Sequence, residues 1–164
     1  MSEQMRTYLE SLRDKVVRFD RGGPESRVGR LLDVYTDYLV LLTEEDGVVY
    51  YKTHHIKSIT EEVKNGIEFD LEASEDFKYE TGENFIDLLR KMKHKWITIN
   101  RGGPEKLEGV IDEITEDYVT VVLYTEVIRL STFHIRNFSY GLKPEPPVPL
   151  EEMEVQRGNL RTEN

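Results

Sequence analysis

The residues that could do chemistry in this chain are three of the four histidines, a set of carboxylates and a motif that occurs twice. Imidazole is a common metal ligand, so His54, His55 and His134 are the first candidates. His134, however, lies 79 residues beyond His55, which is not the spacing of ligands within one helix or hairpin. We therefore expect the histidines to cap or pack a turn, and we expect no bound metal.

Four carboxylates form two related pairs. The second pair lies 80 residues after the first, and the members are Asp33 and Asp37, then Glu113 and Asp117. General acid and base catalysis needs two carboxyl groups in different environments, whereas a repeated segment gives them equivalent ones. The sequence therefore predicts no catalytic residues, no cofactor and no enzymatic activity.

The repeated motif is five residues long. Its first copy is Arg21, Gly22, Gly23, Pro24 and Glu25, and its second copy is Arg101, Gly102, Gly103, Pro104 and Glu105. Glycine permits positive φ and proline presets φ, so the motif predicts a tight turn. Arginine beside glycine amides also suits an anion or a carboxylate of a binding partner. Both interpretations remain open, but a phosphate-binding P-loop is excluded because no Gly-Lys-Ser/Thr follows.

The repeat extends well beyond the motif. Residues 55–59 match residues 134–138 at an offset of 79, so one residue is lost in between, at the tip of an expected hairpin. Each copy opens with apolar residues at helical spacing and continues with alternating apolar residues. The expected strands lie near 15–20, 26–35, 38–43, 47–52 and 56–60, and near 95–100, 107–115, 117–124, 125–131 and 135–140.

A helix followed by five strands is the order of the Sm-like fold. We predict a mainly β protein with short helices, made of two tandem Sm-like (SH3-like) small β-barrels, with bends at Gly29 and Gly109. The predicted modules are residues 1–62 and 82–142. Residues 63–81 form an acidic linker in which alternating apolar residues could form an edge strand, and residues 143–164 form a flexible tail containing proline and glutamate.

Tyr50 and Tyr51 are adjacent in an expected strand, where successive side chains point to opposite faces. Tyr51 aligns with Leu130 of the second repeat and is therefore predicted to face the core. Tyr50 is then expected at the surface, where it is a candidate contact for a partner.

Composition limits the partners. The formal charge is −10, from 32 acidic and 22 basic residues, so nucleic acid is not an expected partner. There is no cysteine, which excludes thiol chemistry and disulfides. No apolar run is long enough for a membrane span and no signal peptide is visible, so we expect a protein made in the cytoplasm without membrane insertion.

Two phrases of the sequence resemble the spore coat protein B family. One is the repeated motif after an apolar strand, as in residues 96–105, and the other is Tyr50-Tyr51 followed by residues 54–59. The resemblance implies a structural protein of the bacterial spore coat, made in the mother-cell cytoplasm, with other coat proteins as partners. The best-known members are longer and end in a phosphorylated serine- and lysine-rich tail, which this sequence lacks. Phosphorylation-dependent assembly is therefore left open.

Two alternatives come from other functional classes. An Sm-like RNA-binding protein is disfavoured because neither the Asp-x-Asn pattern nor the late Arg-Gly pair of Sm-type uridine recognition stands at the matching place in the sequence. An SH3-like adaptor would bind proline-rich peptides in an aromatic groove. A module of about 60 residues buries only about 60% of its unfolded surface, so the modules should pack together or self-associate through exposed edge strands.

Overall fold

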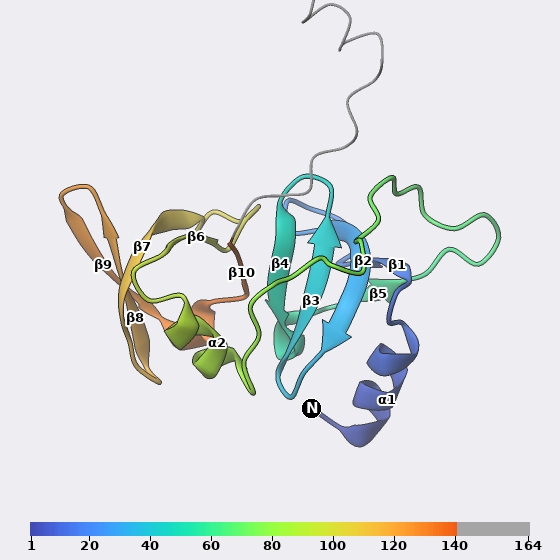
Figure 1. The fold of residues 1–164 in the computed structure, drawn as a ribbon, viewed down its shortest axis with the longest axis horizontal. Coiled ribbons are helices and arrows are strands. Elements are labelled where there is room, and N and C mark those ends of the chain that lie inside the picture. Colours follow the sequence, from blue (N-terminus) through green and yellow to red (C-terminus); the bar gives the residue numbers. More distant parts are fainter. Residues whose placement is uncertain (141–164) are drawn as a thin grey trace, which may run out of the picture.

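The structure is a computed structural model that describes residues 1–140. The flexible tail predicted for residues 143–164 lies outside the described residues. Figure 1 shows the described part as an elongated body in which a strand-rich sheet runs along the longest axis, with one short helix in each half.

The predicted order of one helix and five strands is present in each half, and the mainly β class is confirmed. The first half contains α1 (Glu3–Ser11), β1 (Val16–Phe19), β2 (Arg27–Val34), β3 (Tyr38–Thr43), β4 (Gly47–Lys52), η1 (Thr53–His55) and β5 (Ile59–Thr60). The second half contains α2 (Phe85–Lys91), β6 (Trp96–Ile99), β7 (Leu107–Ile114), β8 (Tyr118–Leu123), β9 (Glu126–Ser131), η2 (Thr132–His134) and β10 (Asn137–Ser139).

The strands form one continuous antiparallel sheet of ten strands. Its order is β5-β1-β2-β3-β4-β10-β6-β7-β8-β9, so β4 of the first half pairs directly with β10 of the second. In that pairing Tyr50 lies opposite Phe138 and Val49 lies opposite Ser139. Two separate small barrels are therefore not confirmed, because the edge strands of the two halves have joined and the sheet is not closed.

The two helices begin at polar caps. The Ser2 side chain accepts a hydrogen bond from the Met5 backbone N–H at 3.2 Å, and the Asn84 side chain accepts one from the Asp87 backbone N–H at 2.9 Å. Each cap satisfies a backbone donor that has no partner inside its helix. The caps fix where the helices start, and therefore which apolar side chains face the sheet.

The glycines expected at strand bends have a steric role. A Cβ on Gly29 would lie 2.6 Å from Leu41 Cγ, and one on Gly109 would lie 2.7 Å from Val121 Cγ1. The next strand therefore approaches each glycine too closely for any side chain. Just beyond, the pairing register shifts between Leu31 and Asp33, and it shifts at the equivalent place in the second half.

The larger of two core clusters extends across both halves. Tyr50 stacks on Phe138 with ring centroids 4.9 Å apart, and Tyr38 meets Phe85 edge to face at 6.2 Å. Each of these pairs joins a strand of the first half to an element of the second. Burial of these rings makes the two halves one packed unit.

The segment between β5 and α2, residues 61–84, contains no helix and no strand. The edge strand that the alternation of Ile67, Phe69 and Leu71 allowed does not form. Leu71 is nevertheless buried, and Phe69 packs against the larger core. Residues 61–84 are called the crossing segment. The crossing segment is packed onto the sheet and is not detached from it. Neither helix among residues 1–140 is long or apolar enough to span a membrane.

Candidate interaction site

Each motif loop is anchored in the same way by the residue that precedes it. Asp20 and Asn100 have positive φ values of 57° and 53°, a conformation that Asp and Asn tolerate better than most residues. The Asp20 Oδ1 accepts a hydrogen bond from the Lys57 backbone N–H at 2.8 Å, and the Asn100 Oδ1 accepts one from the Arg136 N–H at 2.7 Å. The two loops are thereby tied to the segment before the last strand of their own half.

The arginines that begin the two motifs have different surroundings. The Arg101 guanidinium donates to Ser139 Oγ at 2.6 Å, to Thr98 Oγ1 at 3.2 Å and, across to the first half, to Asp46 Oδ1 at 3.1 Å. Among the described residues, the Arg21 side chain makes no hydrogen bond or ion pair, and only its backbone N–H is bonded, to Ser58 Oγ. One motif arginine is therefore used inside the molecule and the other is free at the surface.

The two motif loops touch each other at the joint between the halves. Gly102 has a φ of +86°, and a Cβ there would lie 1.9 Å from the Pro24 carbonyl oxygen. A Cβ on Gly103 would lie 2.8 Å from Glu25 Oε1. Pro24 and Glu25 of the first motif thus pack directly against the glycines of the second motif. In contrast, a Cβ on Gly22 would meet nothing within 4 Å in the described part of the chain.

Opposite charges line this joint. Arg136 Nη2 lies 2.7 Å from Glu25 Oε1, and Arg27 Nε lies 2.9 Å from Asp46 Oδ2. Both are contact ion pairs whose N–H groups are not aligned for hydrogen bonding. Asp46 also forms an ion pair with Arg101, and the Asp46 side chain is only 11% exposed. Partly buried pairs of this kind fix orientation more reliably than they add stability. The site can hold two loops in register, and it presents no nucleophile with a base.

Tyr50 was predicted to lie at the surface, but the structure buries it. It is 1% exposed, and its hydroxyl donates to the Glu80 carbonyl oxygen at 2.7 Å. Tyr51 is buried as predicted, at 4% exposed. Both neighbours are buried because β4 lies in the interior of the sheet and both of its faces are covered. The proposed surface contact at Tyr50 is therefore wrong.

The histidines lie at the edge of the joint. The His55 Nε2 lies 3.0 Å from the Phe133 carbonyl oxygen, and the rings of His54 and His55 lie 4.2 Å apart. Burial is the main cause that lowers the pKa of both His54 and His55 from the ordinary value. Residues 1–140 contain no group of His, Cys, Asp or Glu that could hold a metal ion.

The repeated carboxylates have structural contacts. Asp37 Oδ1 accepts the Phe85 backbone N–H at 2.8 Å, which ties the start of α2 to the first half. Asp33 accepts the Val34 backbone N–H at 2.9 Å and lies 3.7 Å from an Arg13 nitrogen. These contacts give Asp33 and Asp37 of the first half a role in holding the backbone.

Sequence reasoning missed five residues of this site, namely Asp20, Asn100, Arg27, Asp46 and Arg136. Asp20 and Asn100 could have been found, because each immediately precedes the repeated motif. Arg27 and Asp46 could not, since the second repeat has Leu107 in place of Arg27 and is one residue shorter near Asp46. Only the packing of the two halves brings these charges together.

Comparison with known proteins gives one clear relative. Over 142 residues, or 87% of this chain, the sequence is 37% identical to spore coat protein B of Bacillus subtilis (strain 168). The chain spans only 37% of the length of that relative. No protein-family model matches the chain, and no solved structure is significantly similar to it. This similarity, which covers most of the chain, supports a relation to the spore coat protein B family.

Proposed function

We propose that this protein is a structural component of the bacterial spore coat and acts by protein–protein assembly. The observation that carries the proposal is the similarity to spore coat protein B over 87% of the chain. The protein would be made in the mother-cell cytoplasm and then join other coat proteins at the spore surface. It would not be an enzyme, and in support of this Asp33, Asp37 and His55 are engaged in contacts with the backbone.

We further infer that residues 1–62 and 82–142 are two Sm-like or SH3-like modules joined by residues 63–81. The strand order β5-β1-β2-β3-β4 of the first half is repeated as β10-β6-β7-β8-β9 in the second, which supports one common module. In this proposal the repeated motif serves as a contact loop. The packing of the second motif loop against the first is an internal example of such a contact.

A second candidate function has one supporting observation. A hollow beside β4 is lined by four aromatic residues, Tyr50, Phe77, Tyr79 and Tyr140. Aromatic grooves of this kind suit proline-rich peptides, so an SH3-like adaptor is the alternative function. RNA binding has weaker support, since Arg27, Arg101 and Arg136 already face carboxylates and the net charge is −10.

Localisation tests the proposal directly. A fluorescent fusion of the full chain would be produced during sporulation of Bacillus subtilis, with the fluorescent protein alone as the control. We expect the fusion to form a shell around the forespore and the control to stay diffuse. A fusion as diffuse as the control would contradict a coat function. Saturable binding of a proline-rich peptide by that diffuse protein would favour the adaptor.

A further inference from the structure

The joint between the two halves uses different edges of two equivalent modules. The first half contributes β4, whereas the second contributes β10, which corresponds in the repeat to β5. A joint of this head-to-tail kind leaves one copy of each edge unused. The unused edges are β9, which corresponds to β4, and β5 itself. They are the two ends of the ten-stranded sheet and lie toward opposite ends of the molecule (Figure 1).

We propose that β9 of one molecule pairs with β5 of a second copy of this chain and so repeats the internal joint between β4 and β10. The inference rests on the proposed function, because it gives that assembly a defined contact. Such pairing adds a strand to an exposed sheet edge, which is a common mode of association.

The internal joint predicts the register of the new one. Within the molecule the Lys52 backbone N–H donates to the Arg136 carbonyl oxygen at 3.0 Å. The corresponding residues are Ser131 of β9 and Lys57 just before β5. Neither the Ser131 N–H nor the Lys57 carbonyl makes such a bond among residues 1–140. Ile59 of the second copy then faces Arg129, as Phe138 faces Tyr50 inside. The outer side of β9 is open, with Val127 58% exposed.

The two helices differ as the strand edges do: the face of α2 at the joint is covered, whereas the equivalent face of α1 is exposed. Phe85 and Leu88 of α2 are at most 1% exposed, and Phe85 is held by contacts with Asp37 and Tyr38 of the other half. The corresponding residues of α1 are Met5 and Tyr8, which are 46% and 40% exposed. The face of α1 that is open therefore matches the face of α2 that the joint covers. In the proposed contact, this face of α1 in the second copy would meet Asp117 and Tyr118 of the molecule that contributes β9. These two residues are the equivalents of Asp37 and Tyr38.

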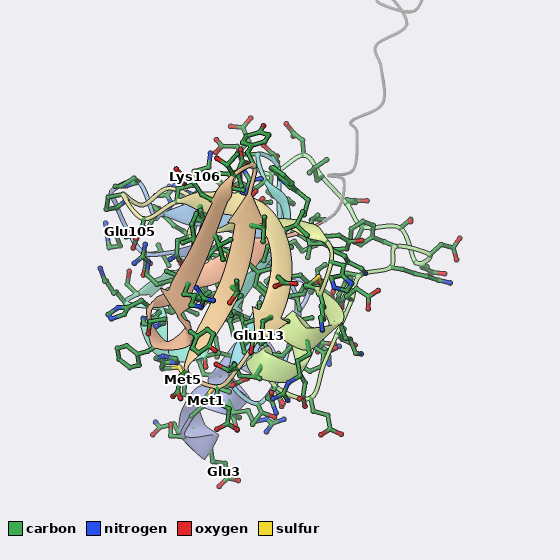
Figure 2. All side chains as sticks on the ribbon, turned by 90° about the vertical axis from the view of Figure 1, so that its left-hand side faces the viewer. Met1, Glu3, Met5, Glu105, Lys106 and Glu113 are labelled. Atoms are coloured by element: carbon green, nitrogen blue, oxygen red, sulfur yellow. The ribbon has the colours of Figure 1, made fainter. Side chains whose placement is uncertain are left out.

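The motif loops give the charge complementarity. Glu25 of the first motif pairs with Arg136 inside the molecule, and the equivalents of these residues are Glu105 and Lys57. Both equivalents are exposed, carry opposite charges and have no side-chain partner among residues 1–140. Figure 2 looks onto the β9 end of the molecule and shows Glu105 beside Lys106 at the upper rim of this face. In the proposed contact a glutamate of a motif loop thus pairs with a basic residue, as Glu25 pairs with Arg136 in the internal joint.

The first glycine of the first motif is accounted for by the same contact. A Cβ on Gly22 would meet nothing within 4 Å among residues 1–140, and the φ of Gly22 does not require glycine. The described part of a single molecule therefore gives no reason for a glycine here. Its equivalent, Gly102, must be glycine because Pro24 lies against it. In the proposed contact, Pro104 of the molecule that contributes β9 lies against Gly22 of the second copy in the same way.

The contact between molecules is weaker than the internal one. Arg129 takes the place of Tyr50, so the aromatic stack with Phe138 has no counterpart. Charged residues on edge strands limit uncontrolled pairing. Association should therefore depend on protein concentration and on salt, because exposed ion pairs contribute to it.

Sedimentation velocity of the full chain over a range of concentrations tests the proposal. We expect the sedimentation coefficient of the unaltered protein to rise with concentration. Lys57→Glu and Glu105→Lys should each abolish the rise, and the double variant, which restores opposite charges, should regain it. Lys64→Glu is the matched control, since Lys64 is an exposed lysine of the crossing segment, and it should behave as the unaltered protein.

A second variant tests the contact independently of charge. Gly22→Gln places a side chain that meets nothing among residues 1–140 of its own molecule but lies against Pro104 of the molecule that contributes β9. It should abolish association while circular dichroism stays unchanged. A protein that sediments as a monomer at every concentration would overturn the proposal, as would charge reversals without effect or a double variant that fails to recover. Coat localisation of such a monomer would leave the proposed function standing, whereas self-association without localisation would contradict only that function.

Discussion

At the scale of single residues, the polar groups that decide this structure join segments far apart in the chain. The Tyr38 hydroxyl donates to the Gly82 carbonyl oxygen at 2.7 Å and accepts from the Gly82 backbone N–H at 2.9 Å. One side chain of β3 thereby satisfies both backbone groups of a residue in the crossing segment. Removing it would leave partly buried polar groups without partners, which is costly.

We expect Tyr38→Phe to lower the free energy of unfolding by about 1–3 kcal/mol, since it removes both of these hydrogen bonds. Urea denaturation would measure the change. Tyr118→Phe is the matched control, because Tyr118 is the repeat equivalent and its hydroxyl makes no hydrogen bond within residues 1–140. The control should differ from the unaltered protein by less than about 0.5 kcal/mol.

The same substitution has a pH signature. Burial raises the pKa of Tyr38 from 10.0 to about 12. Between these values the unfolded chain has lost the proton and the folded protein keeps it, so stability falls as the pH rises through this range. The loss should be smaller in Tyr38→Phe than in the unaltered protein. Equal pH dependence in the two proteins would show that the Tyr38 phenol does not contribute.

At the scale of elements, the crossing segment differs most between the sequence-based prediction and the structure. Its acidic composition indicates a linker, yet Leu71 is only 8% exposed and Arg30 of β2 lies over the Phe69 ring, 5.7 Å from its centroid. A few apolar residues within an acidic run are enough to fix its path, because each buried side chain contributes about 1.5–3 kcal/mol. The acidic side chains remain in water.

We expect Leu71→Ala to lower the free energy of unfolding by about 2 kcal/mol or more, because it leaves a cavity beneath the crossing segment. Val63→Ala in the same segment should change it by less than about 0.5 kcal/mol, since Val63 is 96% exposed. Urea denaturation followed by circular dichroism measures both. Similar small effects of the two substitutions would mean that the segment does not pack on the sheet.

At the scale of the whole molecule, the two repeats have become one cooperative body. The larger core cluster combines residues of β3 and β4 with residues of α2, β8 and β10. Neither half can unfold without exposing Tyr50 or Phe138, which are both less than 2% exposed. Burial across the joint therefore couples the stability of the halves.

We expect a single unfolding transition. Trp96, the only tryptophan, lies in β6 and reports the second half by fluorescence, whereas circular dichroism reports both halves. The two signals should change together in urea, because two-state unfolding makes different probes coincide. Phe138→Ala should shift both midpoints equally. Two separated midpoints would mean that the halves unfold independently.

The sequence by itself determined the repeat, the class of each element and the order of one helix and five strands in each half. These features are local: apolar periodicity reports whether a segment is a helix or a strand, and glycines report where a strand is approached closely. The turn at each motif was predictable for the same reason, since Gly and Pro restrict their own backbone.

Only the tertiary structure decided that β4 pairs with β10, and this one choice accounts for most of the differences. Backbone hydrogen bonds are the same for any pair of strands, so alternation cannot tell which edge will be covered. Tyr50 was predicted to be exposed because alternation assumes one wet face, but the second half and the crossing segment cover that face. The free ends of the sheet at β5 and β9 follow from the same pairing.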